Sequence, residues 1–173
     1  MKALYLTALA GVRRLLLPLL LCCGLAACDD HVNISVPVDV TQAGQSVSVD
    51  FDVIASGGYQ FCLLFYTGEE LEEMNRRFEL YGRIYKPGVA TPVALRLIKD
   101  GRIFMDKQFN AVGSQGTMSA HYNGVNINSA IRNIISPWLP AGHYSARLTV
   151  LEARPQFAGI ETYFHVSNYD PKI

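Results

Sequence analysis

The sequence predicts a mainly β protein, an antiparallel β-sandwich with one amphipathic helix in a crossover between strands. Three observations lead to this prediction. Several short segments alternate apolar and polar residues with a period of two, which is the pattern of half-buried strands. Turn-forming residues separate these segments at intervals of roughly 8–12 residues, as in sandwich folds. A single segment shows a strong helical period, and strand-like segments lie on both sides of it.

The first three strands are predicted near the beginning of the domain. Residues 31–40 alternate, and Pro37 on the outward parity indicates an edge strand because proline cannot donate a ladder hydrogen bond. Residues 46–54 alternate in the same way. A break is expected at Ser56-Gly57-Gly58, and residues 59–66 are apolar on both faces, which predicts a central strand. The expected inward residues of the alternating strands are Val32, Ile34, Val36, Val38 and Val40, then Val47, Val49, Phe51 and Val53.

One helix is predicted after the third strand. Thr67 and Glu70 have the spacing of a capping box with Thr67 as the N-cap. Glu73 and Arg77 are an i,i+4 pair in the favoured order, and Gly82 is placed to end the helix in a left-handed conformation. Apolar residues at spacings of three and four form one stripe, made of Leu71, Met74, Phe78 and Tyr81.

A hairpin and a further short strand are predicted next. Residues 91–99 and 102–109 flank Asp100-Gly101, which is a strong signal for a tight hairpin turn. Residues 117–122 predict a short strand that ends at a second turn, Asn123-Gly124. These segments extend the antiparallel pattern.

The last part of the chain is predicted to return to strands. The apolar spacing of residues 126–136 indicates a short helix or an irregular buried stretch, which Pro137 ends. A Pro-x-Gly turn in residues 139–144 leads into an alternating strand at 144–151, and residues 160–166 give the last strand. The whole pattern is that of an immunoglobulin- or transthyretin-like sandwich.

Residues 1–27 have the parts of a secretory signal peptide. The apolar stretch after Arg14 ends near Cys28, short of the roughly 20 residues that a membrane-spanning helix needs. Leu25-Ala26-Ala27-Cys28 resembles the lipobox of bacterial lipoproteins, in which the cysteine sulfur is acylated and the leader is cut before it. We therefore expect lipid on Cys28, and the alternative is an ordinary cleaved signal beside a cysteine.

The lipobox resemblance implies a location. Residues 28–34 would be a lipidated tether for a sandwich domain at residues 35–168, with the domain facing the periplasm. Asp29 and Asp30 follow the cysteine, and in the enterobacterial version of this class an aspartate there tends to keep the protein in the inner membrane. We expect a lipid-anchored protein of the cell membrane, with the inner membrane slightly favoured.

The charge balance excludes a nucleic-acid surface. The chain has 15 basic and 15 acidic residues, and three of the basic ones, Lys2, Arg13 and Arg14, lie in the leader, which has no acidic residue. The remaining 12 basic and 15 acidic residues give a formal charge of −3. A mildly acidic domain without a Lys/Arg run does not attract nucleic acid.

The cysteines predict no disulfide in the mature domain. Cys22 and Cys23 lie in the leader, and Cys28 is expected to carry lipid. Cys62 remains alone in an apolar strand, where a buried free thiol is expected. If Cys28 carries no lipid, a disulfide between Cys28 and Cys62 is the alternative.

No motif indicates an enzyme, a metal centre or a cofactor. The four histidines are scattered, and no HxH, HExxH, CxxC, GxSxG or GxGxxG pattern occurs. Asp50 and Asp52 share one strand parity, and an exposed strand face explains them more simply than catalysis or calcium binding. We expect no catalytic residues, no metal and no cofactor.

Aromatic residues near predicted loops are the candidates for ligand binding. Trp138, Tyr144 and Tyr122 lie near element ends, where an aromatic ring can bind a sugar or a peptide by stacking and burial. Trp138 is the first candidate, and packing in the core or at its rim is the alternative for all three.

The mature sequence resembles the DUF5625 family, which comprises bacterial lipoproteins of unknown function. The resemblance rests on residues 59–66, on Arg96 with Asp100-Gly101, and on two stretches, Ile131-Arg132-Asn133-Ile134 and Leu139-Pro140-Ala141-Gly142-His143-Tyr144. It covers most of residues 35–165 and implies a β-sandwich, and the family offers no catalytic residues to carry over. A second, more limited resemblance links Thr91–Leu97 to a strand of the type VI secretion lipoprotein, a transthyretin-like sandwich.

These observations predict a lipid-anchored envelope lipoprotein that binds or assembles with a partner and catalyses no reaction. Its expected contacts are the membrane, through lipid on Cys28, and an envelope protein. Two alternatives stay open: a carbohydrate- or peptidoglycan-binding module that uses surface Tyr and Trp, and a secretion-system assembly lipoprotein. A hydrolase with an unrecognised site is a third, and it would need polar residues that converge in one pocket.

Overall fold

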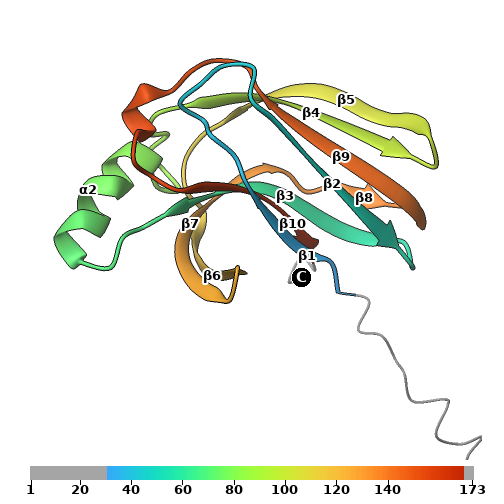
Figure 1. The fold of residues 1–173 in the computed structure, drawn as a ribbon, viewed down its shortest axis with the longest axis horizontal. Coiled ribbons are helices and arrows are strands. Elements are labelled where there is room, and N and C mark those ends of the chain that lie inside the picture. Colours follow the sequence, from blue (N-terminus) through green and yellow to red (C-terminus); the bar gives the residue numbers. More distant parts are fainter. Residues whose placement is uncertain (1–30, 170–173) are drawn as a thin grey trace, which may run out of the picture. The chain divides into compact units, whose positions relative to one another are not determined.

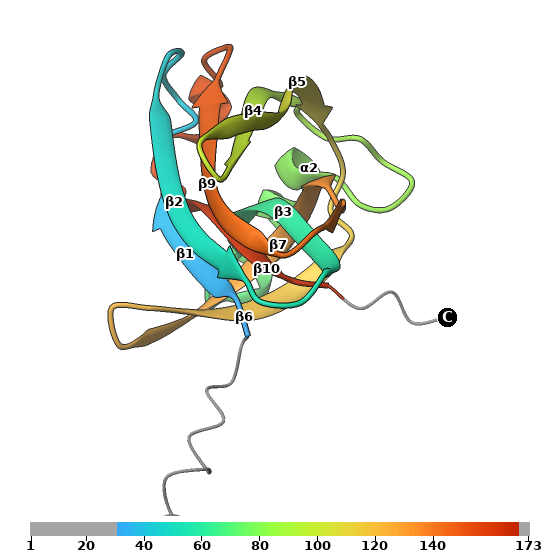
Figure 2. The same ribbon diagram turned by 90° about the vertical axis from the view of Figure 1, so that its right-hand side faces the viewer.

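The computed structural model describes residues 31–169, so the predicted signal peptide and Cys28, Asp29 and Asp30 lie outside the described residues. Within them, two antiparallel sheets pack face to face with one α-helix at one end (Figures 1 and 2). The prediction of a mainly β antiparallel sandwich with one helix is therefore confirmed.

Six strands form the larger sheet, in the order β1-β10-β3-β7-β6, and β8 pairs with the beginning of β3. They are β1 (Asn33–Pro37), β3 (Gly57–Tyr66), β6 (Gly116–Tyr122), β7 (Val125–Ile135), β8 (Trp138–Leu139) and β10 (Thr162–Asn168). β1 lies at one edge, as Pro37 predicted, and β3 lies in the middle, as its two apolar faces predicted. The expected break at Gly57 and Gly58 is instead the start of β3, because these glycines pair with β8.

Four strands form the smaller sheet, in the order β2-β9-β4-β5. They are β2 (Ser46–Val53), β4 (Thr91–Lys99), β5 (Arg102–Ala111) and β9 (Gly142–Val150). The β4–β5 hairpin turns at Asp100 and Gly101, with φ angles of 48° and 76°. Asn123 and Gly124 turn the β6–β7 hairpin with φ angles of 49° and 82°. Positive φ at both central residues is what a type I′ turn requires, so both predicted turns are confirmed.

The main core lies between the two sheets and is rich in aromatic rings. Phe51 of β2 stacks between Tyr59 of β3 and Tyr144 of β9, with ring centroids 5.8 and 5.5 Å away. The Tyr144 hydroxyl donates to the Pro140 carbonyl at 2.9 Å, which fixes the corner where the chain enters β9. The 3-10 helix η1 (Pro155–Phe157) adds another buried ring, that of its last residue.

A second apolar cluster lies on the other face of the larger sheet. It contains Cys62, Leu64, Ala120, Ile127 and Tyr163. The cluster forms because β6 curls back toward β1, as Figure 2 shows. β3 and β10 are therefore buried on both faces.

The helix α2 (Leu71–Tyr81) connects β3 of the larger sheet with β4 of the smaller one, which confirms the predicted crossover. It lies at the end of the sandwich opposite the β4–β5 turn (Figure 1). Tyr81 is fully buried and stacks on Phe65, with ring centroids 5.2 Å apart, and Phe78 packs at its edge. Leu71, predicted to share their stripe, is 69% exposed, because the first turn of the helix lies away from the core.

The predicted capping box is wrong. The Thr67 N–H and hydroxyl both donate to the Asn128 carbonyl, at 2.9 and 3.0 Å, so Thr67 continues the pairing between β3 and β7. The N-cap is Glu70, which makes no side-chain cap hydrogen bond. The predicted Glu73–Arg77 ion pair forms at 2.5 Å. Gly82 ends the helix with a φ of 77° and a ψ of −175°, so it has the positive φ but not the left-handed helical conformation that was expected.

The prediction of a helix or an irregular stretch at residues 126–136 is also wrong, since these residues form most of β7. Its apolar residues serve two clusters on opposite faces: Ala130 lies in the main core and Ile127 in the second cluster. A strand that is apolar on both faces has no clean alternation, so its pattern resembles that of a buried helix.

Candidate functional site

Arg132 is the largest fully buried side chain in the described part of the chain. It extends from β7 toward the loop that follows α2. Its Nη2 donates to the Tyr81 carbonyl at 2.5 Å, and its Nη1 donates to the Val89 carbonyl at 2.7 Å and to the Thr91 hydroxyl at 2.8 Å. One guanidinium group therefore joins the end of α2 and the start of β4 to β7.

This buried cation has no carboxylate partner among residues 31–169. The guanidinium carbon lies 5.0 and 5.8 Å from the ring centroids of Phe65 and Phe157, and these ring faces partly replace the lost hydration. Burial lowers the pKa of Arg132 to about 10, so the group stays charged at neutral pH. Burying a charge without a carboxylate partner is costly, and the hydrogen bonds of the guanidinium group offset part of that cost.

Arg132 fixes both ends of the loop formed by residues 82–88. The Tyr81 carbonyl immediately precedes the loop and the Val89 carbonyl immediately follows it. The Val89 N–H also donates to the Leu80 carbonyl at 2.8 Å, which closes the base of the loop. The loop is thus attached at its start and at its end, and its conformation is set from within the core.

Two glycines allow the loop to close. Gly82 and Gly88 have φ angles of 77° and 63°, and a Cβ on Gly88 would overlap the backbone nitrogen of Gly82. A Cβ on Gly82 would overlap the carbonyl oxygen of Lys86. The N–H of Gly113, in the β5–β6 loop, donates to the Pro87 carbonyl at 2.8 Å and supports the loop from one side.

The tip of the 82–88 loop carries two exposed apolar side chains. Arg83 and Lys86 exchange two backbone hydrogen bonds of 2.8 and 3.0 Å, so the two residues between them form a tight turn. Ile84 is 71% exposed and Tyr85 is 96% exposed. Figure 2 shows the loop that follows α2 projecting from the side of the sandwich. Neighbouring large apolar side chains on a firmly held turn are typical of a binding surface.

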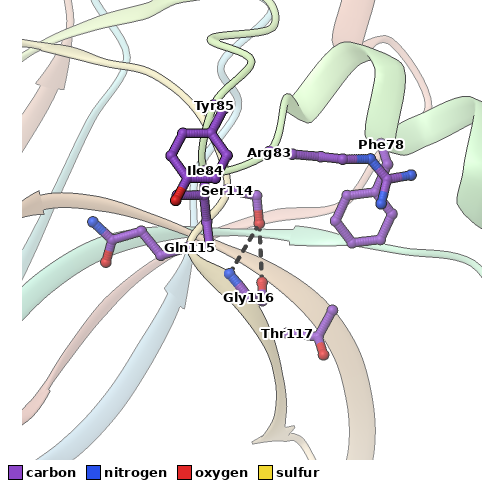
Figure 3. Close-up of a pocket in the computed structure, with 8 residues that line it drawn as sticks. All are labelled: Phe78, Arg83, Ile84, Tyr85, Ser114, Gln115, Gly116 and Thr117. Carbon is purple, nitrogen blue, oxygen red and sulfur yellow. Dashed lines mark hydrogen bonds between the residues drawn. The ribbon is translucent and has the colours of Figure 1, made fainter.

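An open apolar cleft of about 400 Å³ lies between this turn and the beginning of β6. In Figure 3, Ile84 and Tyr85 stand on one side of the cleft, and Arg83 reaches across the ring of Phe78 on the other, 5.0 Å from its centroid. The hydroxyl of Ser114 donates to the main chain of β6 at 2.9 Å and fixes the lower wall. The cleft suits an apolar group that has an anionic neighbour, because Arg83 is its charged residue.

A second hollow, which we call the tyrosine groove, has a volume of about 360 Å³. Its aromatic residues are Tyr66 at the end of β3, Tyr122 at the end of β6 and Tyr163 in β10, and Glu69 and Glu161 line it as well. The rings of Tyr122 and Tyr163 lie 5.1 Å apart, and the Tyr163 hydroxyl donates to Glu161 at 2.8 Å. Burial, and then the bond to Glu161, raise the pKa of Tyr163.

The three aromatic residues predicted to bind a ligand do not come together. Tyr122 lines the tyrosine groove. Trp138 is 67% exposed and pairs with Gly58 at the opposite end of β3 from that groove. Tyr144 is fully buried in the main core, where it stacks on Phe51.

Cys62 and His165 are buried neighbours on β3 and β10. Cys62 is a free, buried cysteine, as predicted, and burial raises the pKa of its thiol to about 12. The Nδ1 atom of His165 lies 2.8 Å from the Ser35 hydroxyl oxygen, and burial lowers the pKa of this histidine to about 4. At neutral pH the thiol is protonated and the imidazole is neutral, and solvent reaches neither of them.

The side chains of Asp50, Asp52 and His143 lie on the surface of the domain. Asp52 and His143 form a pair at 2.8 Å, and this hydrogen bond raises the pKa of the exposed His143. Asp50 is exposed on the same strand face, as expected. Among residues 31–169, no three His, Cys, Asp or Glu side chains gather as a metal site would require. No helix in this part of the chain combines the length and the apolar composition that a bilayer crossing needs.

The sequence reasoning missed Arg132 as a positioning residue and missed the 82–88 loop. A signal for each was present. Arg132 is the one charged residue in the segment Val125–Ile135, which is rich in apolar residues. The loop reads Gly82-Arg83-Ile84-Tyr85-Lys86-Pro87-Gly88, in which glycines bracket two apolar residues between two cations.

The fold is similar to that of solved structures. A crystal structure of a protein from Sulfurospirillum deleyianum matches with a TM-score of 0.65 and 19% sequence identity, covering 80% of this chain and 98% of that one. A family 35 carbohydrate-binding module from Clostridium thermocellum matches with a TM-score of 0.34 and 15% identity, covering 80% of this chain and 92% of that one. The first similarity supports the sandwich fold. A comparison with curated proteins gave no match.

The sequence also matches a described family over most of its length. Residues 35–168 match the domain of unknown function DUF5625. The matched region runs from β1 to β10, so it includes both sheets, the 82–88 loop and the tyrosine groove. On this match, the chain belongs to the DUF5625 family.

Proposed function

We propose that this chain is a lipid-anchored lipoprotein of the cell envelope and that it binds a partner protein without catalysing a reaction. The 82–88 loop carries this proposal, because Arg132 and two glycines hold Ile84 and Tyr85 in an exposed position. If the loop were free to move, Ile84 and Tyr85 would fold back and become less exposed to water. Arg132 prevents this movement although its burial is costly, and a partner that covers Ile84 and Tyr85 explains why.

The anchor in this proposal is lipid on Cys28, supported by the signal-like residues 1–27 and by the lipobox pattern Leu25–Cys28. The domain would face the periplasm, with Asp29 and Asp30 favouring the inner membrane. Five residue steps lead from Cys28 to the first residue of β1, Asn33, and they span at most about 18 Å. The partner would therefore be an envelope protein that reaches close to the membrane surface.

The chemistry of the loop indicates the surface that it fits. Ile84 and Tyr85 would enter an apolar recess, and the cleft beside them would receive an apolar side chain in return. Arg83 and Lys86 flank the pair, so acidic residues around that recess would complement them. The favoured partner is a protein surface with an apolar centre and an acidic rim.

The absence of catalysis is proposed from the state of the reactive groups. Cys62 is buried with a raised pKa, and His165 is buried with a lowered pKa, so neither is available to a substrate. Within residues 31–169, the side chains of the exposed pair Asp52 and His143 make no hydrogen bond to a Ser, Thr or Cys side chain that could act as a nucleophile. A binding function that uses the exposed 82–88 loop therefore requires fewer assumptions than a catalytic one.

The loop can be tested by photo-crosslinking in cells that express the protein natively. With Tyr85→p-benzoylphenylalanine, we expect one dominant cross-linked protein product, and adding Ile84→Asp should reduce it by about tenfold. Lys107→p-benzoylphenylalanine, on an exposed position of β5, is the matched control and should give no such product. Thermal unfolding of the Ile84→Asp variant should be unchanged, because this side chain is 71% exposed. Equal products at positions 85 and 107, or products with lipid alone, would contradict the proposal.

The anchor is tested separately with Cys28→Ala. We expect the wild-type protein to fractionate with membranes and to have an intact mass that matches cleavage before Cys28 plus acyl groups, since two or three acyl chains make anchoring durable. The variant should leave the membrane fraction and lose the acyl mass. Two forms that are equally soluble, with masses that differ only by the substitution, would exclude lipidation and would make a Cys28–Cys62 disulfide the next question.

A further inference from the structure

The tyrosine groove combines ring faces with acidic side chains. Tyr122 and Tyr66 line the groove with half-buried rings, and Tyr122 packs on the buried ring of Tyr163, with the two ring centroids 5.1 Å apart. Glu69 and Glu161 are exposed and line the same hollow. Its volume of about 360 Å³ is within the range of small-ligand sites.

The groove has an excess of negative charge. Glu73 is neutralised by Arg77, whose Nη2 lies 2.5 Å from its carboxylate. Glu161 accepts a hydrogen bond from the Tyr163 hydroxyl, and no basic side chain of residues 31–169 pairs with Glu161 or Glu69. Two carboxylates of the groove therefore lack a cation.

One cation of the chain already uses this surface. The Arg77 guanidinium lies over the ring of Tyr66, 5.1 Å from its centroid, while its Nη1 donates to the Tyr66 carbonyl at 3.0 Å. This contact is an internal example of the recognition that the groove offers, a ring face and a carboxylate around one positive group. Within residues 31–169, the half-buried ring of Tyr122, which packs on Tyr163 beside Glu161, has no cation over it.

We propose that the tyrosine groove binds an organic cation, a protonated amine or a guanidinium group, between the ring of Tyr122 and the carboxylates of Glu69 and Glu161. Ring faces and carboxylates both attract such a group, whereas an anionic ligand would be repelled and a neutral one would leave both carboxylates unpaired. This site shares no residue with the 82–88 loop, so it is independent of the proposed partner surface.

The proposal is tested with the purified domain and a matched pair of probes, Nα-acetyl-arginine amide and Nα-acetyl-citrulline amide, called arginine amide and citrulline amide below; with the α-amine blocked, only the first carries a positive charge. In NMR titrations, we expect arginine amide to shift the signals of Tyr122 and its neighbours, and citrulline amide to bind at least about tenfold more weakly. Affinity for arginine amide should fall as salt is added, because the rim is exposed to solvent. Equal binding of both probes would overturn the proposal, and so would the absence of any shift with arginine amide.

Two variants identify the groups involved. Glu161→Gln keeps an oxygen to accept the Tyr163 hydrogen bond and removes the charge, so it should weaken arginine amide binding by about tenfold. Tyr122→Leu should weaken it by a smaller factor through the loss of one ring face. Glu79→Gln, on an exposed position of α2 outside the groove, makes the same change in net charge and should alter binding less than twofold. An equal loss with Glu79→Gln would mean that only overall charge matters and would overturn the site.

Further probes distinguish where the cation comes from. A Gly-Arg-Gly peptide represents a protein side chain, spermidine represents a free polyamine, and glucosamine compared with N-acetylglucosamine represents an amino sugar. The proposal predicts that the peptide, spermidine and glucosamine all bind. The cation with the highest affinity indicates the natural source. Preference for N-acetylglucosamine over glucosamine would show a neutral sugar site and would contradict the proposal.

Discussion

Arg132→Met is expected to lower the free energy of unfolding by about 3–5 kcal/mol, the loss that follows when a buried, hydrogen-bonded charge is removed from its partners. The partners that it leaves are the carbonyl groups of Tyr81 and Val89 and the hydroxyl of Thr91. Methionine fills a similar volume but donates no hydrogen bond. The two carbonyls belong to the backbone, so no further substitution can remove them from the core.

The same variant should also loosen the 82–88 loop. Hydrogen exchange at the Val89 N–H, which bonds to the Leu80 carbonyl, should accelerate more than exchange in β4 or β9. Arg132→Lys keeps the charge but cannot donate from two nitrogens at once as the guanidinium group does. It should lower the free energy of unfolding by about 2 kcal/mol.

Urea denaturation followed by circular dichroism measures the stability of each variant. Arg96→Met is the matched control, because it breaks an exposed ion pair with Asp106 and should cost less than about 1 kcal/mol. If Arg132→Met were as stable as Arg96→Met, the buried arginine would not hold the loop, and the structural basis of the proposed partner surface would be lost.

His165 should make the domain less stable as the pH falls from about 6.5 to about 4. Burial lowers its pKa to about 4 from an ordinary value of 6.5, so in this window the unfolded chain binds one more proton than the folded domain. The protein therefore loses stability as the pH falls, by about 3 kcal/mol over the window. Protonation would place a charge between Ser35 and Cys62, where no carboxylate compensates it.

Urea denaturation at several pH values tests this prediction. His165→Asn should flatten the dependence between pH 4 and 6.5. His143→Asn is the matched control: its pKa is raised by Asp52, so its contribution has the opposite sign and is lost as the pH rises through the raised pKa. Asp39 and Asp100 have lowered pKa values and act only below their ordinary value near 4, so they do not disturb the window. An unchanged slope in His165→Asn would show that this histidine is not the source.

The strands that could be predicted from the sequence are those with one face buried and the other exposed to solvent. In β2, Val49 and Phe51 are buried while Asp50 and Asp52 are exposed, so the period of two is visible in the sequence. β7 could not be predicted, because its apolar residues serve two clusters and the alternation disappears. The capping-box prediction was wrong for a different reason. The hydroxyl and the N–H of Thr67 both donate to the carbonyl of Asn128, 61 positions away, and so extend the β3–β7 pairing.

The candidate sites could be predicted only in part. Tyr122 stands beside a turn and could be marked as an aromatic candidate, whereas Tyr66 and Tyr163 belong to strands of the core and look like packing residues. The role of Arg132 depends on carbonyls 43 and 51 positions away, and no local pattern shows which carbonyls a side chain will reach. Both sites are products of tertiary structure, and the sequence alone shows only their separate parts.

The position of β10 affects how the chain folds while it is being made. This last strand lies between β1 and β3, so neither of them has a neighbour on that side until residues 162–168 have been synthesised. Pairings between segments this far apart in the sequence also form slowly. A growing chain therefore cannot complete its larger sheet before it is almost finished, and until then the facing edges of β1 and β3 remain open to pairing with other strands.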